Sequence, residues 1–156
     1  MRTKNELGFS LIELLIVVTI IGIIASIAVP NLLASRRAAN EASAQSSMRT
    51  LSSCEATYQY TYGNGTYTDI TSLGVKTLTD SVLSSGQKSG YNFVFTPVPG
   101  PPAQYWGYAV PTLTSGIGQT GTRRFAISED SVLRGDTTLT APADEAAVKA
   151  MPPLGN

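Results

Sequence analysis

A long uncharged apolar segment near the N-terminus limits what this 156-residue chain can fold into. The 22 residues from Leu14 to Ser35 contain no charged side chain, and the 21 residues from Phe9 to Val29 contain one, Glu13. A helix that crosses the hydrocarbon core of a bilayer needs about 20 predominantly apolar residues. The alternative, a buried core helix, fits poorly because isoleucine and valine occur all around the helix without a polar stripe. The sequence therefore predicts a membrane-spanning helix over residues 9–29.

Eight residues, MRTKNELG, precede this segment and are net basic, because Arg2 and Lys4 outnumber Glu6. A basic segment before an apolar run keeps the N-terminus in the cytoplasm. The apolar run is longer than the roughly 7–15 residues of an ordinary secretory signal. Gly8 is the small residue that precedes the run, and cleavage there would leave the span on the mature protein.

Glu13 lies one turn into the predicted span. An uncompensated carboxylate at that depth costs several kcal/mol, so an ionisable residue in a span indicates a function. Proteolysis after Gly8 would free a positive amine on Phe9, four residues before Glu13. That amine could neutralise Glu13 in the same chain or in a neighbouring chain. Alternatively, the glutamate side chain reaches back to the lipid headgroups.

The segment from Gly8 to Arg36, GFSLIELLIVVTIIGIIASIAVPNLLASR, resembles the N-terminus of type IV prepilins and of type II secretion pseudopilins. The residues that carry the resemblance are Gly8 at the end of a short basic leader, Phe9, Glu13 and Pro30. The resemblance implies cleavage between Gly8 and Phe9 by a prepilin peptidase and methyltransferase, with N-methylation of the new Phe9 amine. It also implies that Glu13 pairs with the Phe9 amine of an adjacent subunit.

The same resemblance implies that Pro30 kinks the helix and that Gly22 and Pro30 bracket a stretch that can lose helicity in a filament. Both roles are physically sensible. Proline removes a hydrogen-bond donor and clashes with the carbonyl one turn back, here that of Ser26. Glycine weakens a helix by about 1 kcal/mol relative to alanine.

The helix is predicted to continue to Tyr62, because residues 31–62 contain neither glycine nor proline. At helical spacing, one face of this part presents Met48, Leu51, Tyr58 and Tyr62, with Cys54 and Glu55 between them. Small residues recur every four positions and would allow close helix approach, at Ala34, Ala38, Ala42 and Ser46. Arg36 and Arg37 are interpreted as headgroup contacts, inter-subunit contacts or solvated charges.

Composition changes at Gly63, since 12 of the 14 glycines and eight of the nine prolines lie at or after it. The patterns predict a loop to Gly74, a short helix over 79–85, an exposed connection over 97–103, and strands over 90–96, 105–110, 122–128 and, as a short fourth, 132–133. The predicted fold is α+β, a long N-terminal helix with a transmembrane first half packed on a small antiparallel sheet of three to four strands. The predicted organisation is a cleaved leader at 1–8, the helix at 9–62, a globular head at 63–136 and a flexible tail at 137–156.

The head carries little that indicates catalysis. The chain has no histidine, which excludes Ser-His-Asp and Cys-His sites, and its one cysteine, Cys54, cannot form an internal disulfide. The run from Ser89 through TGTRRFAISEDSVLRGD is similar to the C-terminal part of short pilin-like proteins of environmental Gram-negative bacteria. Some pseudopilins bind calcium in such a region, so Glu129, Asp130 and Asp136 are weak metal candidates, although their order does not match a standard calcium loop. We predict no enzyme activity, no metal and no cofactor.

The charge balance argues against nucleic-acid binding. Eleven basic and 11 acidic residues give zero net charge, which offers no broad cationic surface. Arg123 and Arg124 are two isolated cations, and we interpret them as sheet-edge charges rather than as DNA contacts. The 12 aromatic residues lie mostly at alternating strand positions or on the helix face, which favours packing over electron transfer.

The sequence therefore predicts a structural subunit of a type IV pilus. The expected partners are further copies of the chain in a helical filament, the prepilin peptidase and methyltransferase, a pilus assembly platform and inner-membrane lipid. The precursor is expected in the inner membrane and the filament at the cell surface. Two alternatives stay open: a periplasmic pseudopilin of a type II secretion system, and a monomeric, signal-anchored binding module.

Overall fold

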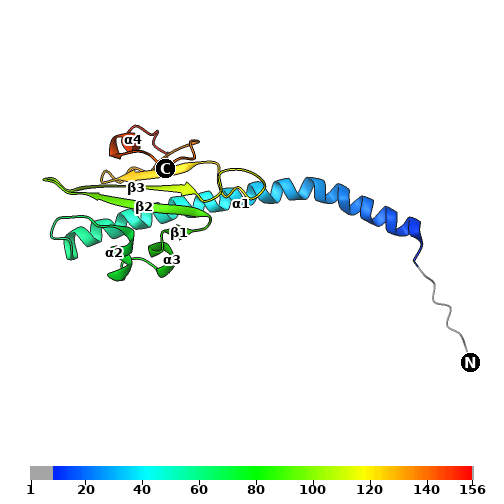
Figure 1. The fold of residues 1–156 in the computed structure, drawn as a ribbon, viewed down its shortest axis with the longest axis horizontal. Helices are drawn as coiled ribbons and strands as arrows, with labels where there is room; N and C mark the ends of the chain where they lie inside the picture. Colours follow the sequence, from blue (N-terminus) through cyan, green and yellow to red (C-terminus); the bar gives the residue numbers. More distant parts are fainter. Residues whose placement is uncertain (1–8, 156) are drawn as a thin grey trace, which may run out of the picture. The chain divides into compact units, whose positions relative to one another are not determined.

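The computed structural model describes residues 9–155, so the predicted leader 1–8 and Gly8 lie outside the described residues. Its first element, helix α1, runs from Leu11 to Thr61 as one 51-residue helix, which confirms the predicted long N-terminal helix. Figure 1 traces α1 as a continuous coiled ribbon. The chain divides after Ser35 into two compact units, so the helix residues from Arg36 onward belong to the same unit as the head.

The first unit consists of the apolar part of α1. Within the described residues α1 is the helix that is long and apolar enough to cross a membrane, by its length and composition. None of its most apolar 18-residue window is buried by the other described residues. The apolar side chains therefore need a covering that the described part of the chain does not provide.

The second unit contains a five-stranded antiparallel sheet in the order β1-β2-β3-β4-β5. Its strands are β1 (Gln87–Lys88), β2 (Tyr91–Val98), β3 (Gln104–Pro111), β4 (Arg124–Ser128) and β5 (Arg134–Asp136). The prediction of three to four strands was therefore too low. The two-residue β1 was missed because Gln87 and Lys88 carry no alternating pattern and pair only through the backbone of β2.

The strand boundaries also differ from the prediction, and β4 begins at Arg124 rather than at residue 122. The last strand lies at Arg134–Asp136 rather than at 132–133, because backbone pairing with β4 places polar residues in a strand at the sheet edge. The β2–β3 hairpin extends through Pro97 and Val98, which pair with Tyr105 and Gln104. The exposed connection is correspondingly shorter than 97–103.

The main core lies between α1 and one face of the sheet. Alternate residues of β2 (Tyr91, Phe93 and Phe95) and of β3 (Tyr105 and Ala109) are buried there, as strand geometry requires. From α1 the buried face presents Ala44, Ser47, Met48, Leu51, Ser52, Cys54 and Glu55. The predicted face is thus buried at its centre, whereas Tyr62 at its far end stays exposed. The small residues Ala34, Ala38, Ala42 and Ser46 are exposed as well.

Two short helices close the side of this core. Helix α2 (Ile70–Val75) lies where the sequence predicted only a loop, and it begins because the Asp69 carboxylate accepts a hydrogen bond from the Ser72 N–H at 2.7 Å. Ile70 and Leu73 on α2 are buried. Helix α3 (Ser81–Ser84) lies within the predicted 79–85 helix and is capped by Asp80.

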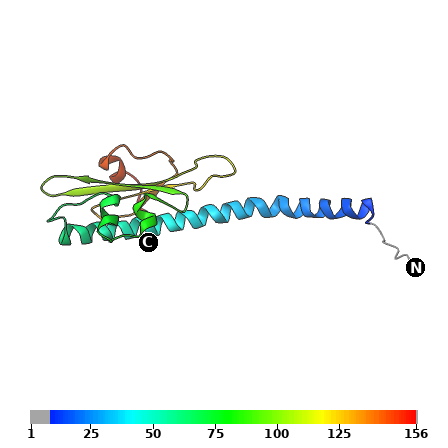
Figure 2. The ribbon, with the colours of Figure 1, turned by 60° about the horizontal axis from the view of Figure 1, so that its bottom comes forward.

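The C-terminal residues cover the opposite face of the sheet. The sequence predicted a flexible tail over 137–156, but the structure contains helix α4 (Glu145–Lys149), and Val148 and Met151 are buried against Ala126 of β4. The Leu154 N–H donates to the Leu133 carbonyl at 2.9 Å, which fastens the segment to the sheet. Figure 2 shows the sheet between α1 and α4. The prediction missed this packing because the alanine- and proline-rich composition of the tail suggested disorder, whereas Val148 and Met151 pack on β4.

Replacing Val148 with aspartate should release the tail without unfolding the head. Val148 is fully buried in the cluster that it forms with Ala126 and Met151, where a carboxylate would lose its contact with water. If the packing of the C-terminal segment on β4 weakens by about 1.4 kcal/mol or more, the rate of tryptic cleavage after Lys149 should rise at least about tenfold. The matched control is Ala146→Asp, which introduces the same charge at an exposed position of α4. Equal cleavage of both variants would contradict the anchoring role of Val148.

Candidate assembly site at the start of the long helix

Glu13 caps the N-terminus of α1. Its Oε2 atom accepts a hydrogen bond from the Ser10 N–H at 2.9 Å, and the helix begins at Leu11. This contact is one half of a capping box, in which the side chain of a glutamate three residues after the N-cap residue accepts a hydrogen bond from the backbone N–H of that residue. A carboxylate there also interacts favourably with the helix dipole. The signature Ser10-Leu11-Ile12-Glu13 is present in the sequence, and our prediction for Glu13 did not include it.

The capped carboxylate retains the capacity for a second partner. An ionised carboxylate accepts hydrogen bonds at about four positions on two oxygens. Phe9, next to the cap, is 79% exposed. The start of the helix therefore presents an exposed aromatic side chain beside a carboxylate that the backbone holds in place.

Two hydroxyl groups within the apolar part of α1 are satisfied by the helix itself. The Thr19 Oγ1–H donates to the Leu15 carbonyl and the Ser26 Oγ–H to the Ile23 carbonyl, each at 2.7 Å. Polar groups in the hydrocarbon region must find partners within the protein. The hydroxyls thus add no unsatisfied donor to the surface of this segment.

Gly22 and Pro30 both lie inside the continuous helix. A Cβ atom added at Gly22 would meet nothing within 4 Å, so no contact within the described chain requires a glycine at that position. Pro30 has no N–H, so the helix lacks one hydrogen bond to the Ser26 carbonyl. Gly22 and Pro30, which both weaken a helix, are therefore helical in the single chain.

We call the exposed large apolar side chains of Phe9 and of this part of α1 the apolar sleeve. Its members are Phe9, Leu11, Ile12, Leu14, Leu15, Ile16, Val17, Val18, Ile20, Ile21, Ile23, Ile24, Ile27, Val29 and Leu32. Water-exposed apolar patches on soluble proteins rarely exceed a few hundred Å². The apolar sleeve is a surface for lipid or for other protein chains.

The three weak metal candidates do not face one another. Asp130 forms an ion pair with Arg134, Asp136 forms one with Arg124 at 2.8 Å, and Glu129 binds Lys149 at 2.7 Å. The hydrogen bonds from Arg134 lower the pKa of Asp130 to about 2, and those from Arg124 lower the pKa of Asp136. No group of three or more potential metal ligands occurs among residues 9–155. Each carboxylate instead fastens one element of the head to another.

The other candidate residues are occupied structurally. Cys54 is buried, its thiol donates to the Leu78 carbonyl at 2.9 Å, and burial raises the pKa of the thiol. Arg124 of β4 donates to both Asp136 of the edge strand β5 and the Thr140 carbonyl, so it cross-links these segments and is not an open cationic site. Arg123 is exposed, and its carbonyl accepts from the Tyr91 hydroxyl.

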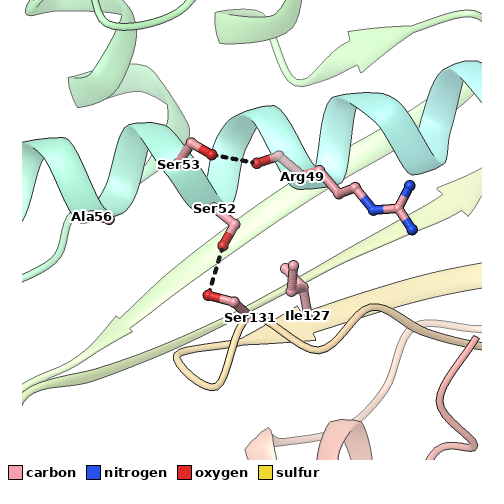
Figure 3. Close-up of a pocket in the computed structure, with 6 residues that line it drawn as sticks. All are labelled: Arg49, Ser52, Ser53, Ala56, Ile127 and Ser131. Atoms are coloured by element: carbon pink, nitrogen blue, oxygen red, sulfur yellow. Dashed lines mark hydrogen bonds between the residues drawn. The ribbon is translucent and has the colours of Figure 1, made fainter. Parts of the chain in front are cut away.

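Figure 3 shows a shallow pocket where α1 passes β4. It is lined by Arg49, Ser52, Ser53, Ala56, Ile127 and Ser131. The Ser52 hydroxyl bonds to the Tyr105 hydroxyl at 2.7 Å and to Ser131 at 3.4 Å, and the Ser53 hydroxyl donates to the Arg49 carbonyl. The Ser52 and Ser53 hydroxyls therefore bond to other groups of the head, and neither is paired with a general base.

A buried carboxyl group at Glu55 was not predicted to be important. Glu55 is fully buried, and its Oε2 atom accepts a hydrogen bond from the Thr68 N–H at 3.1 Å. Its Oε1 atom has no partner among the described residues. Burial raises the pKa of Glu55 to about 7, the Thr68 bond opposes this rise, and the Asp69 charge adds to it. This group fastens the end of α1 to the chain before α2.

A long apolar helix that the described residues leave uncovered, joined to an α+β head, is the architecture of a membrane-anchored precursor. Residues 3–29 match the family described as the prokaryotic N-terminal methylation motif. The chain is also 37% identical over 94 residues to the major component of the type IV wide pilus of Thermus thermophilus, over 55% of this chain and 70% of the relative. No solved structure matches significantly. The chain belongs to the type IV pilin family.

Proposed function

We propose that this protein is a structural subunit of a type IV pilus that polymerises through α1. The observation that carries the proposal is the apolar sleeve, which no residue of the described chain covers. Lipid covers it in the precursor, and the helices of other subunits cover it in the filament. The relative from Thermus thermophilus is itself the major component of a type IV wide pilus.

In this proposal a peptidase cuts between Gly8 and Phe9 and the new amine of Phe9 is methylated. The match of residues 3–29 to a methylation motif supports these two steps. The positive amine then pairs with Glu13 of an adjacent subunit. The capping bond from Ser10 supports this role because it orients the carboxylate at the start of the helix before any partner arrives.

The energetics of the sleeve imply further partners. Lipid tails are as apolar as leucine, so removing the helix from the membrane gains nothing from hydrophobic burial. A pilus assembly platform with a motor must therefore extract the subunit from the inner membrane before it joins the filament at the cell surface. The weak points at Gly22 and Pro30 allow part of α1 to lose helicity as it packs between neighbours. No enzymatic activity is part of this proposal.

Analysis of the mature N-terminus tests the processing step. Mass spectrometry of the protein from sheared cell-surface material should find a chain that begins with methylated Phe9. An intact Met1, or a cut beyond Val29 that removes the sleeve, would contradict the proposal. Electron microscopy of the same material should show fibres, whereas a secretion pseudopilin or a monomeric binding module would leave the sheared fraction empty.

A further inference from the structure

The loop between β3 and β4 presents exposed apolar side chains at one end of the head. Leu113 is 52% exposed and Ile117 is 82% exposed, and we call these two side chains the apolar knob. The Thr120 N–H donates to the Leu113 carbonyl at 3.1 Å, and the Leu113 N–H donates to the Thr120 hydroxyl at 3.2 Å. The Asn40 side chain of α1 also donates to the Thr120 carbonyl at 2.9 Å. These bonds fasten the loop to the head, so the apolar knob is held in solvent.

An apolar pocket lies beside the connection between β2 and β3. It has a volume of about 310 Å³ and is lined by Thr66, Tyr67, Pro97, Val98, Pro99 and Ala103. Its walls are held in place, because Pro97 pairs with Tyr105 in the hairpin and the Tyr67 ring packs on the Tyr105 ring with 4.7 Å between the centroids. None of the six lining residues is charged. The apolar pocket therefore suits an apolar side chain better than a charged one.

The apolar knob and the apolar pocket lie at opposite ends of the same head. Residues 97–103 come before β3 and residues 112–121 come after it, and the eight residues of β3 span about 24 Å from end to end. Figures 1 and 2 both show the two connections at the two ends of the sheet. The knob of one chain therefore cannot reach the pocket of the same chain, whereas it can enter the pocket of a second chain.

The charge pattern favours such a contact between copies. All 32 residues from Tyr91 to Thr122 are uncharged, so neither the two strands nor the two connections carry charges that would repel one another. A contact between two different patches leaves one knob and one pocket free in every pair of chains. Further copies can therefore add in the same way, and contacts of this heterologous kind generate open filaments when their rotation does not close a ring.

We propose that the apolar knob of each subunit enters the apolar pocket of another copy of this chain in the filament. Burial of the Ile117 side chain then adds a contact between heads to the packing of the α1 helices. The two patches lie at opposite ends of the head, so the contact continues from copy to copy. This inference rests on the pilus subunit of the proposed function.

Disulfide cross-linking in fibres tests this contact. Sheared fibres of the full-length chain with Ile117→Cys and Ala103→Cys are treated with a mild oxidant. A disulfide needs Cα atoms within about 7 Å of each other, so two cysteines at opposite ends of β3 in one chain cannot bridge. The matched control combines Ile117→Cys with Val75→Cys, because Val75 is 75% exposed on α2 and lies outside the pocket. The single variants measure disulfides between like positions, and the native chain measures any reaction of the buried Cys54.

We expect the pair at 117 and 103 to give a ladder of covalent multimers, with a cross-linked fraction several-fold above that of the control pair. Equal cross-linking of the two pairs overturns the proposal. A single variant that cross-links as strongly as the double variant also overturns it, because like positions then meet. Cross-linking of position 103 to a different protein overturns it as well, since another partner then occupies the pocket.

A second variant decides the matter if the double variant forms no fibres. Ile117→Ser removes the exposed side chain and should lower the yield of sheared fibres several-fold relative to Val75→Ser. Equal yields of these two variants overturn the inference. The native chain separates the two levels of the proposal: native fibres without the expected ladder or loss contradict only this inference. A native chain that forms no fibres contradicts the proposed function as well.

Discussion

Replacing Glu13 with alanine should reduce filament yield by at least about a hundredfold, because removing one partner of a desolvated ion pair costs about 3–5 kcal/mol. The variant leaves the Phe9 amine of each neighbouring subunit without its counter-charge in an apolar environment. Insertion of the precursor should be unaffected, since the substitution makes the span more apolar. Immunoblots of the sheared fraction measure filament yield, and carbonate extraction of membranes measures insertion.

The structure supplies a sharper control for this experiment, because Glu13 has two separable roles. Glu13→Gln retains an oxygen that can accept the Ser10 N–H, since glutamine also completes a capping box, but it removes the charge. If pairing with the amine drives assembly, both variants lose filaments. If Glu13 serves only to cap α1, Glu13→Gln assembles as the native chain does, and the charge-pairing role is wrong.

The head should become less stable as the pH rises from about 4.5 to about 7. Glu55 has a pKa of about 7 in the folded chain, against an ordinary value of 4.5, because burial disfavours its charged form. In this window the folded state binds more protons than the unfolded state, so the free energy of unfolding falls with rising pH. A shift of this size corresponds to about 3 kcal/mol. Denaturant unfolding of the detergent-solubilised chain at pH 5 and pH 8 measures the difference.

Glu55→Gln should remove most of this pH dependence. Glutamine keeps an acceptor for the Thr68 N–H and carries no charge at either pH. Glu41→Gln, which changes a half-buried carboxylate on the same helix, should retain the slope because Glu55 is still present. The depressed pKa values of Asp130 and Asp136 act at lower pH, where their ion pairs are lost, and lie outside this window. A slope that survives in Glu55→Gln would show that another group titrates.

The predictions that succeeded concern elements whose pattern is local. Tyr91, Phe93 and Phe95 alternate along a single strand, and the absence of glycine and proline over 31–62 predicts the helix without reference to any partner. The elements that were missed are short and acquire their conformation from a neighbour. β1 exists through its pairing with β2, and α4 through the burial of its Val148, with Met151 just after the helix, against Ala126 of β4.

The assembly site divides in the same way. Phe9 and Glu13 were proposed as assembly residues from the sequence, and so was the need for a counter-charge, because a carboxylate in a span is costly wherever it occurs; these roles stay predictions. The sequence also contains the pattern that predicts the helix cap, a serine at position 10 followed three residues later by Glu13. Glu55 was noted between residues of the predicted apolar face. Its hydrogen bond with Thr68 was not predicted, because Thr68 lies 13 residues further along the chain and beyond a turn.

By itself, the sequence determined that this chain has an apolar helix that needs a membrane or other chains to cover it, because hydropathy and helical period are summed over neighbouring residues. Only the tertiary structure decided which polar groups lose water and which apolar ones keep it. The burial of Glu55 and the exposure of Ile117 follow from contacts between segments far apart in the chain, and no local pattern encodes them.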